Sequence, residues 1–234
     1  MSACLHSIQV GRVQSFQDAD GRQWESGILK SPVSGPVFVG ADKLDGDEQS
    51  DRTHHGGVDK AVRGYSLEHF ESWFADADTI GHSDWKPLAG SFGENLTITG
   101  QNEEDVCIGD VYRIGTCVLE VSQPRQPCWK LSRRWGIPKL AVHVQKTGRT
   151  GWYYRVITQG QMIAGDKIQR LNRPNPNWTI ARAHAVMHAS PRNPQDDLEL
   201  SNCPKLSKSW AEQLANRAKN AIAKSEPAKL FGSD

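Results

Sequence analysis

The chain has 234 residues, of which 24% are charged and 37% hydrophobic, and its formal net charge is +1. These values fit a soluble globular protein with one large domain and a small appendage, and the near-zero charge argues against binding of a nucleic-acid polymer. We expect no membrane association, because neither a signal-like N-terminus nor a long apolar run is present. Scattered cysteines without ligand spacing argue against disulfides and structural zinc, and favour the reducing cytoplasm. The five are Cys4, Cys107, Cys117, Cys128 and Cys203.

The first hundred residues predict short strands joined by glycine-rich turns, with one helix. We expect strands at 5–12, 37–39 and 96–99. The helix is expected at 66–77 with Ser66 as its N-cap, because apolar residues recur there at helical spacing. These apolar residues are Leu67, Phe70, Phe74 and Ala77.

Two polar segments in this region are candidate ligand-binding loops. His55, Gly56 and Gly57 precede Lys60, a pattern that favours a loop whose backbone approaches a ligand closely while the lysine faces an anion. A surface turn with locally bonded histidines is the alternative, and the residues alone favour it. Asn95 follows Gly93 and Glu94, where a turn network and a ligand-orienting role both remain open.

Residues 106–121 predict a hairpin turning at Gly115-Thr116, because apolar residues alternate on both sides of that pair. Cys107 and Cys117 are then strand residues, for which a small buried side chain is the ordinary role.

The central stretch is Gln123 to Leu131, reading Gln-Pro-Arg-Gln-Pro-Cys-Trp-Lys-Leu. Pro124 and Pro127 stiffen the chain and predict that it cannot pair there as a central strand. Cys128 then stands before a segment that can start a helix. Between residues 121 and 165 the sequence has eight Lys or Arg and no Asp or Glu. Such a field favours the thiolate form of a cysteine and attracts anionic ligands. An inert buried cysteine beside a solvated basic face is an equally weighted alternative.

The rest of the chain predicts a helix at 139–146, with Pro138 in its first turn and Gly148 after its end, and strands at 152–157 and 167–171. Many short strands with glycine turns favour a barrel over residues 1–171. After a Pro-Asn linker, helical patterns at 179–188, after Asn193-Pro194 and from 207 to about 224 predict a helical domain over residues 172–234. We expect this tail to be separable and to serve partner docking.

The chain resembles bacterial MOSC-domain proteins, named for the C-terminal domain of molybdenum-cofactor sulfurase, and especially the 6-N-hydroxylaminopurine resistance branch. The likeness covers nearly the whole chain, including the tail with Leu206-Ser-Lys-Ser-Trp210, and its most specific block is Gln123-Pro-Arg-Gln-Pro-Cys128. The other matching pieces are Asp47-Glu-Gln, His55-Gly-Gly, Lys60-Ala, Glu68-His-Phe, Phe92-Gly-Glu-Asn-Leu, Ile108-Gly-Asp, Thr147-Gly-Arg-Thr-Gly-Trp and Gly165-Asp166.

The resemblance implies a mainly β fold with α-helices, in which a MOSC β-barrel precedes a small three-helix domain. It implies binding of the molybdenum cofactor (molybdopterin), with Cys128 as the metal ligand and catalytic residue. The residues that it places at the cofactor are His55, Gly56, Gly57, Lys60, Asn95, Gln123 and Arg125. His54 departs from the plain family pattern, so His55 is preferred.

The implied activity is reduction of N-hydroxylated nucleobases and related small molecules. Electrons would come from a separate reductase, because the sequence shows no dinucleotide fingerprint or iron–sulfur cysteine set. Two alternatives remain open: a sulfur or cofactor carrier using Cys128, and a cysteine hydrolase pairing Cys128 with His55 or His143. The physiological substrate, the electron donor and the oligomeric state, a homodimer included, also stay open.

Overall fold

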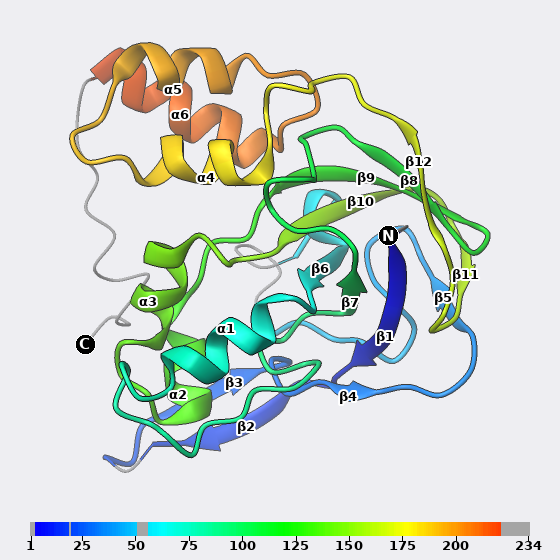
Figure 1. Cartoon of the computed structure of the whole chain (residues 1–234), viewed down its shortest axis with the longest axis vertical. Helices are drawn as coiled ribbons and strands as arrows, with labels where there is room; N and C mark the ends of the chain where they lie inside the picture. Colours follow the sequence, from blue (N-terminus) through cyan, green and yellow to red (C-terminus); the bar gives the residue numbers. More distant parts are fainter. Residues whose placement is uncertain (1–2, 19, 51–55, 221–234) are drawn as a thin grey trace.

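The computed structural model describes residues 3–18, 20–50 and 56–220. Its centre is an eight-stranded sheet of order β12-β8-β9-β10-β6-β7-β1-β4 (Figure 1). All neighbouring pairs are antiparallel except β6 and β7, which are parallel. The strands are β1 (Cys4–Val10), β4 (Ser31–Pro32), β6 (Val62–Ser66), β7 (Leu96–Thr99), β8 (Val111–Ile114), β9 (Cys117–Pro124), β10 (Trp152–Thr158) and β12 (Ile168–Asn172). Two further ribbons pair β2 (Gln14–Gln17) with β3 (Gln23–Ser26), and β5 (Val37–Val39) with β11 (Gly160–Met162).

The sheet curls strongly, but the predicted barrel is not closed by a continuous ladder within the described residues. β12 and β4 are the two ends of the strand order. The start of β1 nevertheless lies against the approach to β12, since the Leu5 amide donates to the Asp166 carbonyl at 2.9 Å and the Ile168 amide to the Ala3 carbonyl at 3.0 Å. Only one β-bridge, Cys4 to Lys167, forms there. The contact is confined to the start of β1, whose last residues, Gln9 and Val10, pair with β4.

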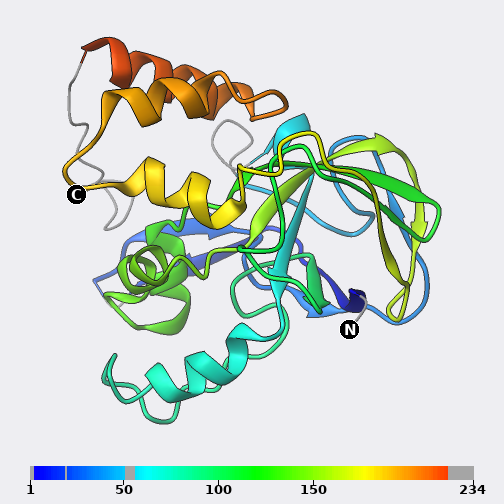
Figure 2. The same ribbon diagram turned by 45° about the horizontal axis from the view of Figure 1, so that its top comes forward.

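Two groups of helices flank the sheet. Figures 1 and 2 show α4–α6 as a layer at one end and α1–α3 near the β2–β3 ribbon at the other. The helices are α1 (His69–Asp76), α2 (Trp129–Trp135), α3 (Leu140–Thr147), α4 (Ile180–His188), α5 (Pro194–Ser201) and α6 (Lys208–Asn220), with a short 3₁₀ helix η1 (Val58–Lys60).

The helical tail shares its hydrophobic core with the sheet. Val121 of β9 belongs to the same buried cluster as Ile180, Trp210 and Leu214, each at most 1% exposed. The Ser207 amide also donates to the Ser122 carbonyl of β9 at 2.9 Å. Residues 172–220 therefore pack directly on the strand that leads to Cys128. The domain boundary at 171/172 stays a prediction.

The predicted helix at 66–77 begins later than expected. Ser66 is not an N-cap but the last residue of β6, where it pairs with Ile98, and α1 starts at His69. Phe70 and Ala77 are buried as expected, but Trp73 is fully buried and Phe74 is 46% exposed. The parallel pairing with β7 holds Ser66 in extended backbone and overrides its capping preference.

The central hairpin is confirmed, since Ile114 and Cys117 pair across a two-residue turn. Cys107 is not in a strand and makes only an isolated bridge with Thr179. The expectation that Pro124 ends pairing was also wrong, because β9 continues to Pro124, opposite Trp152. As the last residue of the strand, Pro124 gives up little by lacking an amide hydrogen.

Most other elements lie within a few residues of their predicted bounds. Pro138 precedes the N-cap Lys139 and is therefore outside α3, whereas Gly148 ends that helix at φ 72°, as predicted. Thr179 and Asn193 cap α4 and α5 with their side chains. The predicted end of the last helix near residue 224 lies outside the described residues.

Candidate functional site

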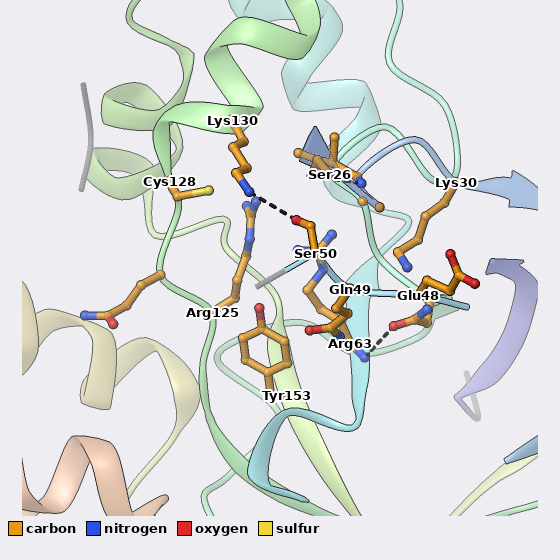
Figure 3. A pocket seen from close by; sticks show the side chains of 15 residues that line it. Ser26, Lys30, Glu48, Gln49, Ser50, Arg63, Arg125, Cys128, Lys130 and Tyr153 are labelled. Carbon is orange, nitrogen blue, oxygen red and sulfur yellow. Dashed lines mark hydrogen bonds between the residues drawn. The ribbon is translucent and has the colours of Figure 1, made fainter. Parts of the chain in front are cut away.

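A pocket opens beside Cys128, between the β2–β3 ribbon, residues 48–50, the start of α2 and the ends of β6 and β10 (Figure 3). It encloses about 610 Å³ of empty space, part of it open to solvent. Its polar and charged lining includes Lys30, Glu48, Ser50, Arg63, Asn95, Arg125, Cys128, Lys130 and Tyr153.

Cys128 is held at the rim of the pocket by the start of α2. It is the N-cap residue, with extended backbone at φ −128° and ψ 164°, and its carbonyl accepts the first helical hydrogen bond from the Leu131 amide at 3.1 Å. Its half-buried side chain does not cap the helix. The thiol is therefore available to a ligand in the pocket.

Two side chains from neighbouring strands, Arg63 and Tyr153, form part of the pocket wall. Tyr153 of β10 lies opposite Arg63 of β6 on one side and opposite Gln123 of β9 on the other. Directly opposed residues project from the same face of a sheet. Trp152 and Tyr154 project from the other face and belong to the hydrophobic core. The pairing therefore places Arg63 and Tyr153, 90 residues apart in sequence, side by side.

Arg125 is a buried cation without a counter-ion among the described residues. It is 2% exposed, its side chain makes no hydrogen bond there, and its Nη1 is buried without a partner. The pKa of Arg125 is lowered to about 10, mainly by burial and to a lesser degree by the neighbouring Arg63 cation. Tyr153 and Cys128 partly oppose this shift. An unpaired buried charge is costly, and an anion bound in the pocket would offset this cost.

The other cations of the pocket have protein partners. Lys30 pairs with the buried carboxylate of Asp47, yet burial lowers its pKa despite that partner. Arg63 donates to the Phe92 carbonyl. Lys130 donates to the Ser50 hydroxyl at 3.2 Å (Figure 3) and to the Glu25 carbonyl of β3 at 2.8 Å.

Asn95 lines the pocket, but its amide is used within the protein. Its Oδ1 accepts from the Arg63 amide at 3.1 Å, and its Nδ2 donates to Asp47 at 3.0 Å and to the Gln9 carbonyl at 3.3 Å. Gln123 is 1% exposed and is not among the lining residues; its Nε2 donates to the Pro124 carbonyl at 3.1 Å, and its Oε1 has no partner. Contacts of either residue with a cofactor stay predictions.

The predicted glycine loop is only partly described. His55 lies outside the described residues. Gly56, Gly57 and Lys60 are not among the residues lining the pocket. Gly57, at φ 93°, precedes η1, and a Cβ there would meet nothing within 4 Å, so backbone conformation, not space, requires glycine. Their roles at a cofactor stay predictions.

The histidine required by the hydrolase alternative does not line the pocket in the described part of the chain. His143 instead lies 3.1 Å from an Asp76 carboxylate oxygen and stacks edge-on against Trp73, with ring centres 5.7 Å apart. The structure therefore does not bring His143 and Cys128 together.

Three of the other cysteines are buried thiols. Cys107, Cys117 and Cys203 are at most 6% exposed, and burial raises the pKa of Cys117 to about 11 and that of Cys203 to about 12. The half-buried Cys4 contacts the Gly165 carbonyl at 3.4 Å. In the described ranges, no group of three or more His, Cys, Asp or Glu is placed to hold a metal ion.

Sequence reasoning missed Lys30, Arg63 and Tyr153. The signal for Arg63 was a lone charge in the short strand Val62–Ser66, and Tyr153 follows a buried tryptophan in β10. Neither signal identifies a pocket without knowledge of the strand pairing. No helix within the described residues is long and apolar enough to cross a membrane.

Comparison with known proteins gives two family matches. Residues 51–169 match the MOSC domain, and residues 178–219 match the YiiM-like, 3-alpha helix domain. Uncharacterized protein YflK of Bacillus subtilis is 37% identical over 87% of this chain and 89% of its own length. Protein YiiM of Escherichia coli is 31% identical over 96% and 97% of the two chains. A protein of Gibberella moniliformis named Reductase is 38% identical over 86% of this chain, but the match spans only 35% of that protein.

Solved structures agree with these matches. The crystal structure of YiiM from Geobacillus stearothermophilus superimposes with a TM-score of 0.76 at 33% identity, covering 92% of this chain and 99% of that one. YiiM from Escherichia coli gives a TM-score of 0.77 at 27% identity, covering 96% and 100%. The resemblance noted from the sequence is confirmed: the chain belongs to the MOSC-domain family, in the branch that carries a YiiM-like three-helix domain after the MOSC domain.

Proposed function

We propose that this protein is a molybdenum-cofactor-dependent reductase of N-hydroxylated nucleobases and related small molecules. The observation that carries the proposal is the meeting of an accessible thiol, Cys128, and an unpaired buried guanidinium, Arg125, in one pocket. Membership in the MOSC family supports the choice of cofactor, and the relative named Reductase supports the reaction class.

The residues present fit the molybdenum cofactor. Its pterin part carries a phosphate, and an anionic group of that kind would supply the partner that Arg125 Nη1 lacks. A thiolate is a soft ligand and matches a thiophilic metal. The fit rests on the chemistry of these lining residues, because the empty space of about 610 Å³ includes open solvent.

In this assignment Cys128 is the protein ligand to molybdenum, and the metal centre, when bound, supplies the two-electron chemistry. Arg125 and Arg63 hold the anionic part of the cofactor. Asn95 has an indirect role. Its side-chain amide donates to Asp47, and Asp47 in turn holds Lys30 at the pocket. Electrons come from a separate reductase, and the reaction takes place in the cytoplasm on a small-molecule substrate.

The test is molybdenum content together with reduction of an N-hydroxylated base by an artificial electron donor. Cys128→Ser should fold normally, because the side chain is half-buried and its size hardly changes, but it should lose both metal and activity. Cys117→Ala is the matched control: it removes a thiol from a fully buried position in β9 and should keep both.

Two results would count against the proposal. Retention of metal and activity by Cys128→Ser would refute the ligand assignment. A wild-type protein that binds molybdenum but reduces no N-hydroxylated base would instead support the carrier alternative.

A further inference from the structure

We propose that Tyr153 donates the proton that turns the leaving hydroxyl group of the substrate into water. This inference rests on the proposed reductase function and adds to it a catalytic residue that the sequence did not indicate. Its basis is the position of the Tyr153 side chain in the pocket.

Tyr153 directs its hydroxyl group into the pocket between two cations. The strand pairing sets it beside Arg63, and Figure 3 shows its hydroxyl pointing toward the space between Arg63 and Arg125. Although Tyr153 is only 7% exposed, its hydroxyl has no hydrogen-bond partner among the described residues. A polar group left open toward a pocket is therefore available to a ligand.

The other candidate donors that line the described pocket are engaged or unfit. The Lys30 ammonium is bonded to Asp47, and that of Lys130 to a backbone carbonyl of β3 and a serine hydroxyl. Glu48 accepts a hydrogen bond from the Val13 amide at 2.9 Å. Arg63 donates to the Phe92 carbonyl, and Arg125 is assigned to the anionic part of the cofactor. The Tyr153 hydroxyl is left, and a phenolic hydroxyl both donates and accepts hydrogen bonds.

The reaction balances with this role. Reduction of R–NH–OH to R–NH₂ and H₂O consumes two electrons and two protons and breaks the N–O bond. The two electrons would be supplied by the metal centre when it is bound, and ultimately by the separate reductase. Tyr153 gives one proton to the departing oxygen, and solvent supplies the second proton to nitrogen. Tyr153 then recovers its proton from solvent, which reaches the open side of the pocket.

The experiment compares Tyr153→Phe with Tyr154→Phe in the metal-loaded protein. Both changes remove one phenolic oxygen from β10, but Tyr154 faces the core, away from the pocket. Three quantities are measured: molybdenum per chain, the equilibrium Kd for an N-hydroxylated purine without reductant, and kcat with an artificial donor. Loss of a general acid lowers rates by roughly 10²- to 10⁴-fold. We therefore expect Tyr153→Phe to lower kcat at least about 100-fold, with metal content and Kd within about threefold of wild type. Tyr154→Phe should leave all three quantities close to wild type.

Several outcomes would overturn the assignment. They are a kcat for Tyr153→Phe within about threefold of wild type, a loss of molybdenum in proportion to activity, or a rise in Kd that matches the fall in kcat. The second would make Tyr153 a cofactor-binding residue and the third a substrate-binding one. Failure of the reductase function itself is distinguishable, because the wild type would then be loaded but inactive.

Discussion

Replacing Arg125 by methionine should stabilise the cofactor-free protein. The guanidinium is 2% exposed and has no hydrogen-bond partner in the described structure, so its charge is buried without compensation. Methionine fills similar space with a flexible apolar side chain. The change therefore removes an unfavourable charge and leaves no other buried group unpaired.

The magnitude follows from the pKa of Arg125, which burial and the Arg63 cation lower from 12.5 to about 10. Because a tenfold change in an acid dissociation constant corresponds to about 1.4 kcal/mol, folding with the charged side chain costs about 3 kcal/mol. For a base with a lowered pKa, this cost is complete below the folded value and disappears as pH rises through 10 toward 12.5. At pH 7 it is present in full. After some loss of packing, we expect Arg125→Met to raise the unfolding free energy by about 1–3 kcal/mol.

Arg134→Met is the matched control with the opposite expected sign. Burial also lowers the pKa of Arg134 to about 10, but this side chain donates to the Ile28 carbonyl at 2.9 Å and to the Gly90 carbonyl at 2.7 Å. Removing it takes away the hydrogen bond to the Ile28 carbonyl, whereas the Gly90 carbonyl keeps the Gly93 amide at 3.0 Å, and should cost about 1–3 kcal/mol if the Ile28 carbonyl stays buried. Urea unfolding of cofactor-free protein at pH 7 measures both variants. The reasoning is refuted if Arg125→Met is as destabilised as Arg134→Met.

Two further variants test the supports of the site. Asp76→Asn should weaken the pH dependence of the unfolding free energy in the acid range. Burial alone would raise the pKa of Asp76, but hydrogen bonds from Arg149 and His143 lower it below 3.8. Its contribution is therefore complete above 3.8 and lost as pH falls through the lower folded value. Urea midpoints of wild type and variant that converge as pH falls below 3.8 would show this, whereas parallel curves would contradict it. Leu214→Ala should lower the unfolding free energy of the whole chain by about 2–5 kcal/mol, seen as a single urea transition. Leu198, which is 45% exposed, is the control, and Leu198→Ala should be nearly neutral. A separate transition at lower urea would show instead that the tail unfolds alone.

The parts of the site that could be predicted are those encoded by contiguous residues. The turn at Gly115-Thr116 and the start of a helix after Cys128 each depend on backbone preferences within a few positions. For this reason the sequence placed Cys128 and Arg125 together and before a helix, where the structure has them. The specific family block strengthened that local interpretation.

The parts that could not be predicted depend on strand pairing over long distances. Arg63 and Tyr153 become neighbours only through the β6–β10 register, and a shift of one residue would turn either side chain into the core. Barrel closure failed as a prediction because strand number and turn spacing do not fix how far the first and last strands overlap.

The helical tail contacts β9, the strand that leads to Arg125 and Cys128. These contacts argue against its expected role as a separable docking unit. Arg155 of β10 donates to Asp59 of η1 at 2.9 Å, to Glu120 of β9 at 2.6 Å and to the Lys205 carbonyl of the tail at 2.9 Å. The second Asp59 oxygen accepts from the Lys208 amide, at the first residue of α6, at 3.1 Å. β9 runs from this junction to Pro124, next to Arg125. A displacement of the tail would therefore move β9 and, with it, the position of Arg125 in the pocket. Tail and sheet also share one core. Separability stays a prediction, but these contacts argue that the tail holds β9 and η1 in place, whatever partner it binds on its outer face.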